Sequence, residues 1–253
     1  MNFIKFLGTA GARFVVIKQL RASGGIFFSL SGTNLLVDPG PGCLVKSIKS
    51  RPSIDPLKID GIFLSHKHID HSGDINIMIE AITNGGFQKK GTLFVPQDAL
   101  EEKSSVVFIY LRDFLEKVEI LQEKKKYLLK NITLEIPVRH IHRVETYGFK
   151  IKFDNTFISY IPDTKYFENL IDSYKGSNIV IINTVLYEKK EELDHLSLPE
   201  AEEIIKNINP QKAILTHFGM TMLKNKIWEK TKEISERTGV EIISAKDGMT
   251  LNF

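Results

Sequence analysis

Cysteine is almost absent from this chain, with Cys43 alone among 253 residues. A single thiol excludes an intramolecular disulfide and a cysteine-rich zinc cluster, and it favours a reducing compartment such as the cytoplasm. The sequence also lacks an apolar run of the length that a transmembrane helix needs. Residues 1–8 lack the charged-then-apolar order of a signal peptide. We therefore expect a cytoplasmic protein without a membrane partner.

Neither sign of charge dominates, because 34 Lys and Arg balance 31 Asp and Glu to a formal net charge of +3. This balance is too even to predict a nucleic-acid surface by itself. Hydrophobic residues form 42% of the chain and charged residues 26%, which is typical of a globular domain. A chain of this length commonly folds as one α/β unit. With no linker or low-complexity segment, we expect a single domain over residues 1–253.

Histidine is also scarce, yet three of the seven histidines lie in the segment His66-Lys67-His68-Ile69-Asp70-His71. An apolar run over residues 61–65 predicts a buried strand before it, and the spacing of apolar residues predicts a helix over residues 70–83. In an extended loop His66 and His68 point the same way, whereas Asp70 and His71 come later and can face a second point. Four ligand-type side chains in six residues predict a loop shared by two metal ions rather than an ordinary polar surface loop.

Further polar residues follow other predicted strands. They are Asp38 after residues 33–37, His142 after 132–138, Asp163 after 156–161, His195 ahead of a helix opening at Pro199, and His217 after 212–215. Strands and helices occur in runs, and short links at 31–32 and 154–155 predict hairpins. This order predicts an α/β fold with two mixed β-sheets packed face to face and helices outside. Strand ends in such a sandwich can converge on one edge.

The glycines in Gly8-Thr9-Ala10-Gly11 follow the first predicted strand. They lack the third glycine, and no helix is predicted next, so they do not match a dinucleotide-binding fingerprint. We expect a loop near the site instead. Asp38 has two interpretations. It is a turn-forming residue or, as we favour, a hydrogen-bond acceptor that fixes a ligand imidazole.

The pattern His-x-His-x-Asp-His after a strand resembles the metallo-β-lactamase superfamily of metal-dependent hydrolases, and the resemblance extends from Asp38 through His217. It implies an αββα sandwich. It also implies two divalent metal ions: one held by His66, His68 and His142, the other by Asp70, His71 and His217, with Asp163 bridging both. Zinc is the expected metal, but manganese or iron would accept the same nitrogen and oxygen ligands.

Residues 142–149 are similar to the ribonuclease Z pattern, in which a ligand histidine precedes a Gly-aromatic pair by this interval. The pattern favours His142 as the ligand and leaves His140 as an alternative. The Asp163-Thr164 pair and His195 resemble the same subgroup. That resemblance implies that His195 contacts the scissile phosphate or protonates the leaving oxygen, while Asp70 can accept a proton from the attacking water.

These features predict a dinuclear phosphodiesterase that uses a metal-bridging hydroxide on a phosphodiester, cyclic phosphate or nucleotide-type substrate. Two alternatives remain: a ribonuclease Z-like endonuclease that processes the 3′ end of tRNA, and an ester or lactone hydrolase. RNA is not favoured, because ribonuclease Z usually carries a long arm where residues 143–162 leave space for only a hairpin. Diiron relatives carry Glu in place of His68, which argues against oxygen chemistry. The sequence predicts no oligomeric state.

Overall fold

The computed structural model describes residues 2–253, with only the backbone of Ala12; Met1 lies outside the description. The described residues form two sheets of seven strands each. The first sheet has the order β14-β1-β2-β3-β4-β5-β6, with β1 Phe3–Phe6, β2 Ile26–Leu30, β3 Thr33–Val37, β4 Gly61–Phe63, β5 Thr92–Val95, β6 Lys117–Ile120 and β14 Thr250–Asn252. The second has the order β13-β12-β11-β10-β9-β8-β7, with β7 Lys126–Leu129, β8 Ile132–Glu135, β9 Phe149–Phe153, β10 Thr156–Ile161, β11 Ile179–Asn183, β12 Lys212–Thr216 and β13 Glu241–Ser244.

Both sheets are mixed, as predicted. In the first sheet β3, β4, β5 and β6 run parallel, whereas β1, β2 and β3 alternate in direction. In the second sheet β10, β11, β12 and β13 run parallel, and β7 to β10 form antiparallel hairpins. Parallel neighbours place their carboxyl ends at one edge of a sheet, where ligands typically bind in α/β proteins.

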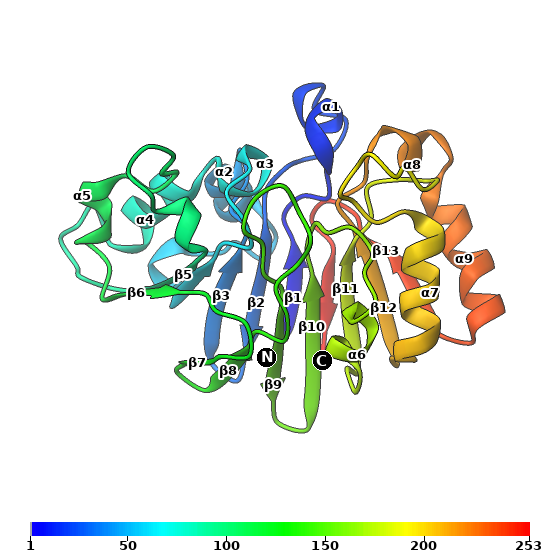
Figure 1. The fold of residues 1–253 in the computed structure, drawn as a ribbon. Coiled ribbons are helices and arrows are strands. Elements are labelled where there is room, and N and C mark those ends of the chain that lie inside the picture. The colour runs from blue at the N-terminus through cyan, green and yellow to red at the C-terminus, as the bar shows by residue number, and fades with distance from the viewer. Residues whose placement is uncertain (1) are drawn as a thin grey trace.

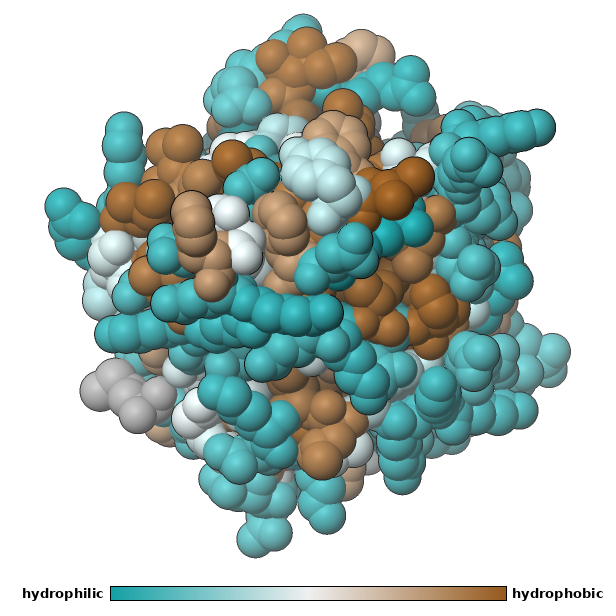
Figure 2. Space-filling model, turned by 90° about the vertical axis from the view of Figure 1, so that its left-hand side faces the viewer, coloured by the Kyte–Doolittle hydropathy of each residue, from teal (hydrophilic) through white to brown (hydrophobic). Residues whose placement is uncertain are grey.

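Helices cover the outer face of each sheet (Figure 1). The helical elements are α1 Ala12–Ile17, α2 Cys43–Lys49, η1 Pro56–Lys58, α3 Ile69–Ser72, α4 Ile75–Ile82, η2 Gln97–Ala99, α5 Ile109–Arg112, α6 Leu170–Tyr174, α7 Leu198–Ile208, α8 Met220–Lys224 and α9 Ile227–Thr238. On the face that carries α4 and α5, apolar patches alternate with hydrophilic side chains (Figure 2). Among the described residues, no helix combines the length and hydropathy that crossing a membrane requires.

Three apolar clusters hold the layers together. The central cluster lies between the sheets, where Phe149 of the second sheet packs edge-on against Phe28 and Phe63 of the first at ring-centroid distances of 5.7 and 4.9 Å. A second cluster joins the first sheet to α2, α4 and α5, and a third joins the second sheet to α6, α7 and α9. Such burial is the main favourable contribution to folding. The four layers confirm the predicted αββα sandwich.

Two expectations about helices were wrong. The helix predicted over residues 70–83 divides into α3 and α4, because the Asp74 carboxylate turns away to accept hydrogen bonds from the backbone N–H groups of Gly42 and Leu44, at 3.1 and 3.0 Å. It thereby caps the start of α2. After Gly11, where no helix was predicted, the short helix α1 begins. The loop itself lies near the site, as expected, since Gly11 contacts the backbone of His217.

Candidate metal centre

The predicted site residues gather at the edge of the sandwich where β3, β4, β10 and β12 end. Asp38 and the His66–His71 segment come from the first sheet, and Asp163 and His217 from the second. His142 lies on the segment between β8 and β9, and His195 on the segment between β11 and α7. The structure therefore brings together all seven predicted metal ligands and His195.

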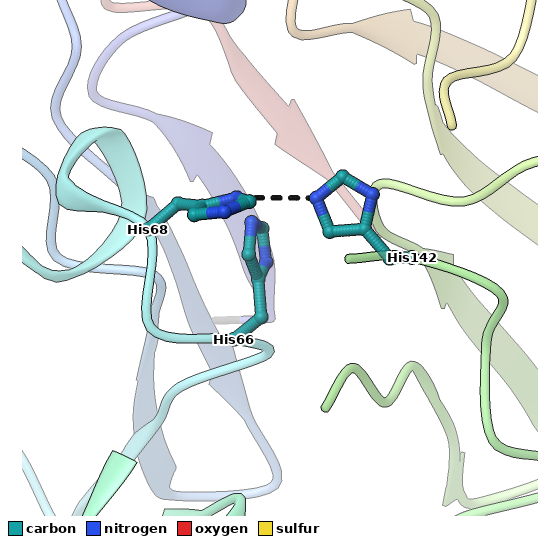
Figure 3. A group of neighbouring side chains, drawn as sticks. All are labelled: His66, His68 and His142. Atoms are coloured by element: carbon teal, nitrogen blue, oxygen red, sulfur yellow. Dashed lines mark hydrogen bonds between the residues drawn. The ribbon is translucent and has the colours of Figure 1, made fainter. Parts of the chain in front are cut away.

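The first group consists of His66, His68 and His142, whose ligand atoms lie within 4.8 Å of one another. Figure 3 shows His66 and His68 extending from one loop toward His142 on a separate segment. Nε2 of His142 lies 3.1 Å from Nδ1 of His68. Nδ1 of His142 lies 2.9 Å from the carbonyl oxygen of Asp194. Because a carbonyl only accepts, Nδ1 carries the proton and Nε2 directs a lone pair at His68.

The second group consists of Asp70, His71 and His217. Nε2 of His217 lies 3.2 Å from Nε2 of His71 and 3.5 Å from an Asp70 carboxylate oxygen. The left-handed backbone of His217, with φ of 60°, turns its side chain back into this group. A Cβ on Gly11 would lie 2.0 Å from the His217 carbonyl oxygen, so only glycine fits beside this turn.

Asp163 lies between the two groups. One carboxylate oxygen is 3.6 Å from Nε2 of His71 and 3.4 Å from Nε2 of His217. Asp163 also lies within ligand distance of His66, which belongs to the first group, and of His71, which belongs to the second. Its other oxygen accepts a hydrogen bond of 2.9 Å from the side-chain amide of Asn183. Asp163 is thus near His66 of the first group and near His71 and His217 of the second, and its bridging role stays a prediction.

Asp38 lies beneath both groups and accepts four hydrogen bonds. The donors are Nδ1 of His71 at 2.9 Å, the hydroxyl of Tyr160 at 2.7 Å, and the N–H and hydroxyl of Ser65 at 2.6 and 2.7 Å. Because the Ser65 hydroxyl donates to Asp38, it can accept from Nδ1 of His66 at 3.0 Å. Asp38 thus favours the tautomer with a proton on Nδ1 in both imidazoles, directly for His71 and through the Ser65 hydroxyl for His66. Each Nε2 is then free to ligate.

Electrostatics at this edge favour a cation. Burial lowers the pKa of His66 well below its ordinary value, which keeps the ring neutral as a metal ligand must be. Burial alone would lower the pKa of His217 too, but Asp163 raises it to about 9. For Asp163, burial is outweighed by His217 and His195, which hold the pKa of its carboxyl well below its usual range. The carboxylates that retain protons on histidine would equally stabilise a divalent ion.

The donor atoms fit such ions. Nε2 of His66 is buried and has no hydrogen-bond partner within residues 2–253. The two imidazole–imidazole contacts, at 3.1 and 3.2 Å, match the edge of roughly 3.3 Å that two nitrogens span in a tetrahedral zinc site. Nitrogen and carboxylate oxygen donors at these separations suit Zn²⁺, Mn²⁺ or Fe ions equally.

His140 is directed away from these groups. Its Nε2 lies 2.8 Å from the hydroxyl of Tyr174, and the side chain is only 3% exposed. Burial, followed by the neighbouring His142, lowers its pKa to about 3. Among the described residues, it joins none of the ligand groups. The geometry therefore favours His142 over His140.

His195 lies beside Asp163, outside both ligand groups. Its Nδ1 lies 3.3 Å from an oxygen of Asp163, and 20% of its side chain is exposed. Its ring is 5.2 Å from the ring of His142, yet in the described part of the chain it belongs to neither ligand group. A histidine so placed can reach a substrate bound over the metals.

The sequence analysis missed the partners that orient the ligands. Tyr160 and Asn183 bond to each other at 3.2 Å and bond to Asp38 and Asp163, respectively. Both are buried polar residues near the ends of otherwise apolar strands. A polar side chain at the end of a buried strand was the only available signal, and it was not used.

Comparison with known proteins identifies the chain. Residues 33–218 match the model of the Beta-lactamase superfamily domain. The chain belongs to this superfamily. It is a metallo-β-lactamase superfamily hydrolase, so the predicted family is confirmed. Membership implies divalent metal ions, and the His and Asp groups described above fit that requirement.

Three similar proteins represent the family. The uncharacterized protein MJ1374 of Methanocaldococcus jannaschii is 31% identical over 257 residues, covering 99% of this chain and 94% of that protein. Ribonuclease Z of Borrelia garinii subsp. bavariensis is 26% identical over 310 residues, covering 98% and 96%. The solved metallo-β-lactamase fold protein YhfI from Bacillus subtilis has a TM-score of 0.81 at 22% identity, covering 99% of this chain and 98% of that chain.

Replacing Asp38 with asparagine should weaken metal binding about 10- to 100-fold, the usual effect of losing a residue that orients a ligand. In asparagine only the amide oxygen accepts hydrogen bonds, whereas the amide nitrogen donates them. The four hydrogen bonds to residue 38 cannot all be kept, so His66 and His71 lose their fixed orientation. Chelator competition with Zn²⁺ measures the effect. Asp60→Asn is the matched control, because Asp60 is equally buried at 7% exposure but bonds to Lys130 instead. Equal affinity in Asp38→Asn and wild type would contradict the role given to Asp38.

Proposed function

We propose that the protein is a phosphodiesterase that acts with two divalent ions, zinc in the first place, on a small phosphodiester, cyclic phosphate or nucleotide-type substrate. The two ligand groups on either side of Asp163 carry the proposal. His66, His68 and His142 would hold one ion, and Asp70, His71 and His217 the other. We further propose that Asp70 and His195 are the catalytic residues.

Two bound ions would lower the pKa of water and neutralise charge on the phosphoryl oxygens during an in-line displacement. Asp70 is positioned to receive the proton of the attacking water. Its pKa is held far below its usual value, because His71 and His217 outweigh the effect of burial, so it is a carboxylate at neutral pH. Nδ1 of His195 is buried beside Asp163, at 3.3 Å, so we assign to Nε2 the donation of a proton to the leaving oxygen.

The resemblance to phosphodiesterase branches of the superfamily, in which such a histidine contacts the scissile phosphate or protonates the leaving oxygen, favours a phosphodiester over a carbon ester or lactone. An alkoxide that leaves phosphorus needs a proton donor beside it. His195 supplies one without serving as a ligand. The likeness to ribonuclease Z of Borrelia, a protein named for cleaving RNA, supports the same reaction class.

Hydrolysis of bis-p-nitrophenyl phosphate, compared with hydrolysis of simple lactones, tests the proposal. We expect turnover of the phosphodiester only, by protein that contains close to two ions per chain by elemental analysis. Activity should vanish on chelation and return with Zn²⁺ or Mn²⁺. Lactone hydrolysis without phosphodiester turnover would favour the ester-hydrolase alternative, and a reproducible content near zero with metal added would overturn the two-ion site.

Endonucleolytic processing of tRNA is the second candidate, because the Borrelia relatives carry the ribonuclease Z name. We nevertheless predict weak cleavage of precursor tRNA. Between His142 and Asp163, the hairpin of β9 and β10 occupies residues 149–161, so this interval has no space for a tRNA-binding arm. The net charge of +3 also supplies little of the phosphate neutralisation on which RNA binding depends. Gel assays at physiological salt measure this, and efficient site-specific cleavage would establish the second candidate instead.

A further inference from the structure

Lys67 lies between two predicted ligands, His66 and His68. Because side chains alternate along an extended segment, Lys67 points away from the ligand group. Its ammonium lies 3.1 Å from a carboxylate oxygen of Asp98, with only 21% and 18% of the two side chains exposed. It also contacts the Asp98 carbonyl and the Ser104 hydroxyl, each at 3.3 Å. Partial burial makes such a pair less subject to screening than a surface pair.

Asp98 in turn bonds to Glu145 through a reciprocal pair of hydrogen bonds. The backbone N–H of Asp98 donates to the Glu145 carboxylate at 3.1 Å, and the backbone N–H of Glu145 donates to the Asp98 carboxylate at 3.2 Å. The other Glu145 oxygen accepts from the hydroxyl of Tyr147 at 2.8 Å. One oxygen of Asp98, Oδ2, therefore pairs with the Lys67 ammonium and also accepts the hydrogen bond from the Glu145 N–H.

This chain of contacts joins the two segments that form the first ligand group. Lys67 belongs to the loop after β4 in the first sheet, and Glu145 follows His142 by three residues on the segment that enters β9 in the second sheet. A backbone hydrogen bond from Tyr147 to Ser65, at 3.0 Å, is a further link between them. Asp38, by contrast, supports residues of both ligand groups, and Gly11 lies beside His217 of the second.

We propose that Lys67, Asp98 and Glu145 form an inter-sheet clasp of positioning residues that sets the distance between His66 and His68 on one sheet and His142 on the other. The inference rests on the proposed two-ion site. The clasp lies outside both ligand groups and touches no ligand side chain, so its effect is confined to geometry. Disrupting it should weaken the first metal site selectively.

Chelator-competition titration with Co²⁺, followed by its visible absorption, tests the clasp in Lys67→Met and, in parallel, Glu145→Gln. We expect one binding step to weaken about 10- to 100-fold, as for other residues that orient ligands, while the other step keeps its affinity. The absorption of the weakened step should shift, because the ligand geometry changes. Lys67→Arg, which retains the charge, should recover most of the lost affinity.

Lys130→Met is the matched control. Lys130 also joins the sheets, through a 2.6 Å contact with Asp60. Asp60 precedes β4 whereas His66 follows it, so this contact lies at the opposite end of the strand from the ligands. We expect it to lower the melting temperature and leave both binding steps unchanged. The clasp is overturned if Lys67→Met and Glu145→Gln behave like this control, or if both steps weaken equally. A wild-type protein that binds two ions but does not hydrolyse phosphodiesters would overturn the proposed function alone, whereas wild type binding fewer than two ions would overturn both.

Discussion

Replacing Asp163 with alanine should lower phosphodiester turnover by about 10³-fold. Metal ions contribute several kcal/mol to transition-state stabilisation, and each 1.36 kcal/mol is a factor of ten in rate. Asp163 lies within ligand distance of His66 in the first group and His71 in the second, so its loss should disturb both ions. Metal content should also fall below two per chain.

Asp172→Ala is the control for this change, since Asp172 is an exposed carboxylate whose pair is Lys175 on the surface. Steady-state kinetics and elemental analysis of both variants measure the effect. If Asp163→Ala kept its two ions and lost less than tenfold in rate, Asp163 would not be a bridging ligand. Full activity in Asp172→Ala would show that the loss in Asp163→Ala comes from the position of Asp163 and not from the removal of any carboxylate.

Replacing His195 with alanine should lower kcat by about 10² to 10⁴-fold, the usual contribution of a positioned proton donor, while both ions stay bound. The imidazole lies beside Asp163 but outside both ligand groups. Its removal therefore affects the leaving oxygen more than metal binding. The loss should be smaller for a substrate with a nitrophenolate leaving group, which needs little protonation, than for an alkyl phosphodiester.

Lys190→Ala serves as control on the same segment, because Lys190 is exposed and its backbone carbonyl bonds to Leu193. Metal content is measured beside kcat in each variant. Unchanged activity in His195→Ala would make His195 a surface residue without a role. Loss of one metal equivalent would instead make it a ligand.

Periodicity predicted the placement of polar residues at strand ends, and the family resemblance added the convergence of residues as distant in sequence as Asp38 and His217 on one edge. The alternation of apolar and polar residues along a strand is a local property of the sequence. The sandwich forms when the apolar faces of the two sheets pack together. The break between α3 and α4 was not predictable in this way, since Asp74 bonds to backbone groups of α2 about thirty positions earlier. A contact across the fold overrides the local pattern there.

The choice between His140 and His142 shows the same limit. Both are polar residues after one strand, and motif spacing favoured His142 without excluding His140. The structure separates them, because His140 packs against Tyr174 whereas His142 lies beside His68. Likewise, Tyr160 and Asn183 acquire their roles from strands that become neighbours only in the folded sheet. The residues that gather at this edge were thus more accessible to sequence analysis than the hydrogen bonds that orient them.

The division of the ligands between the two sheets has a thermodynamic consequence. A state in which either sheet has opened contains no complete set of donors, so an ion can bind tightly only to the fully assembled fold. Each such site adds RT ln(1 + [L]/Kd) to the free energy of unfolding, about 2.7 kcal/mol when the free ion is at 100 times its Kd. Metal binding should therefore slow amide hydrogen exchange in β4 and β12 alike, although the two strands belong to different sheets. The ions would make the sandwich unfold as one cooperative unit.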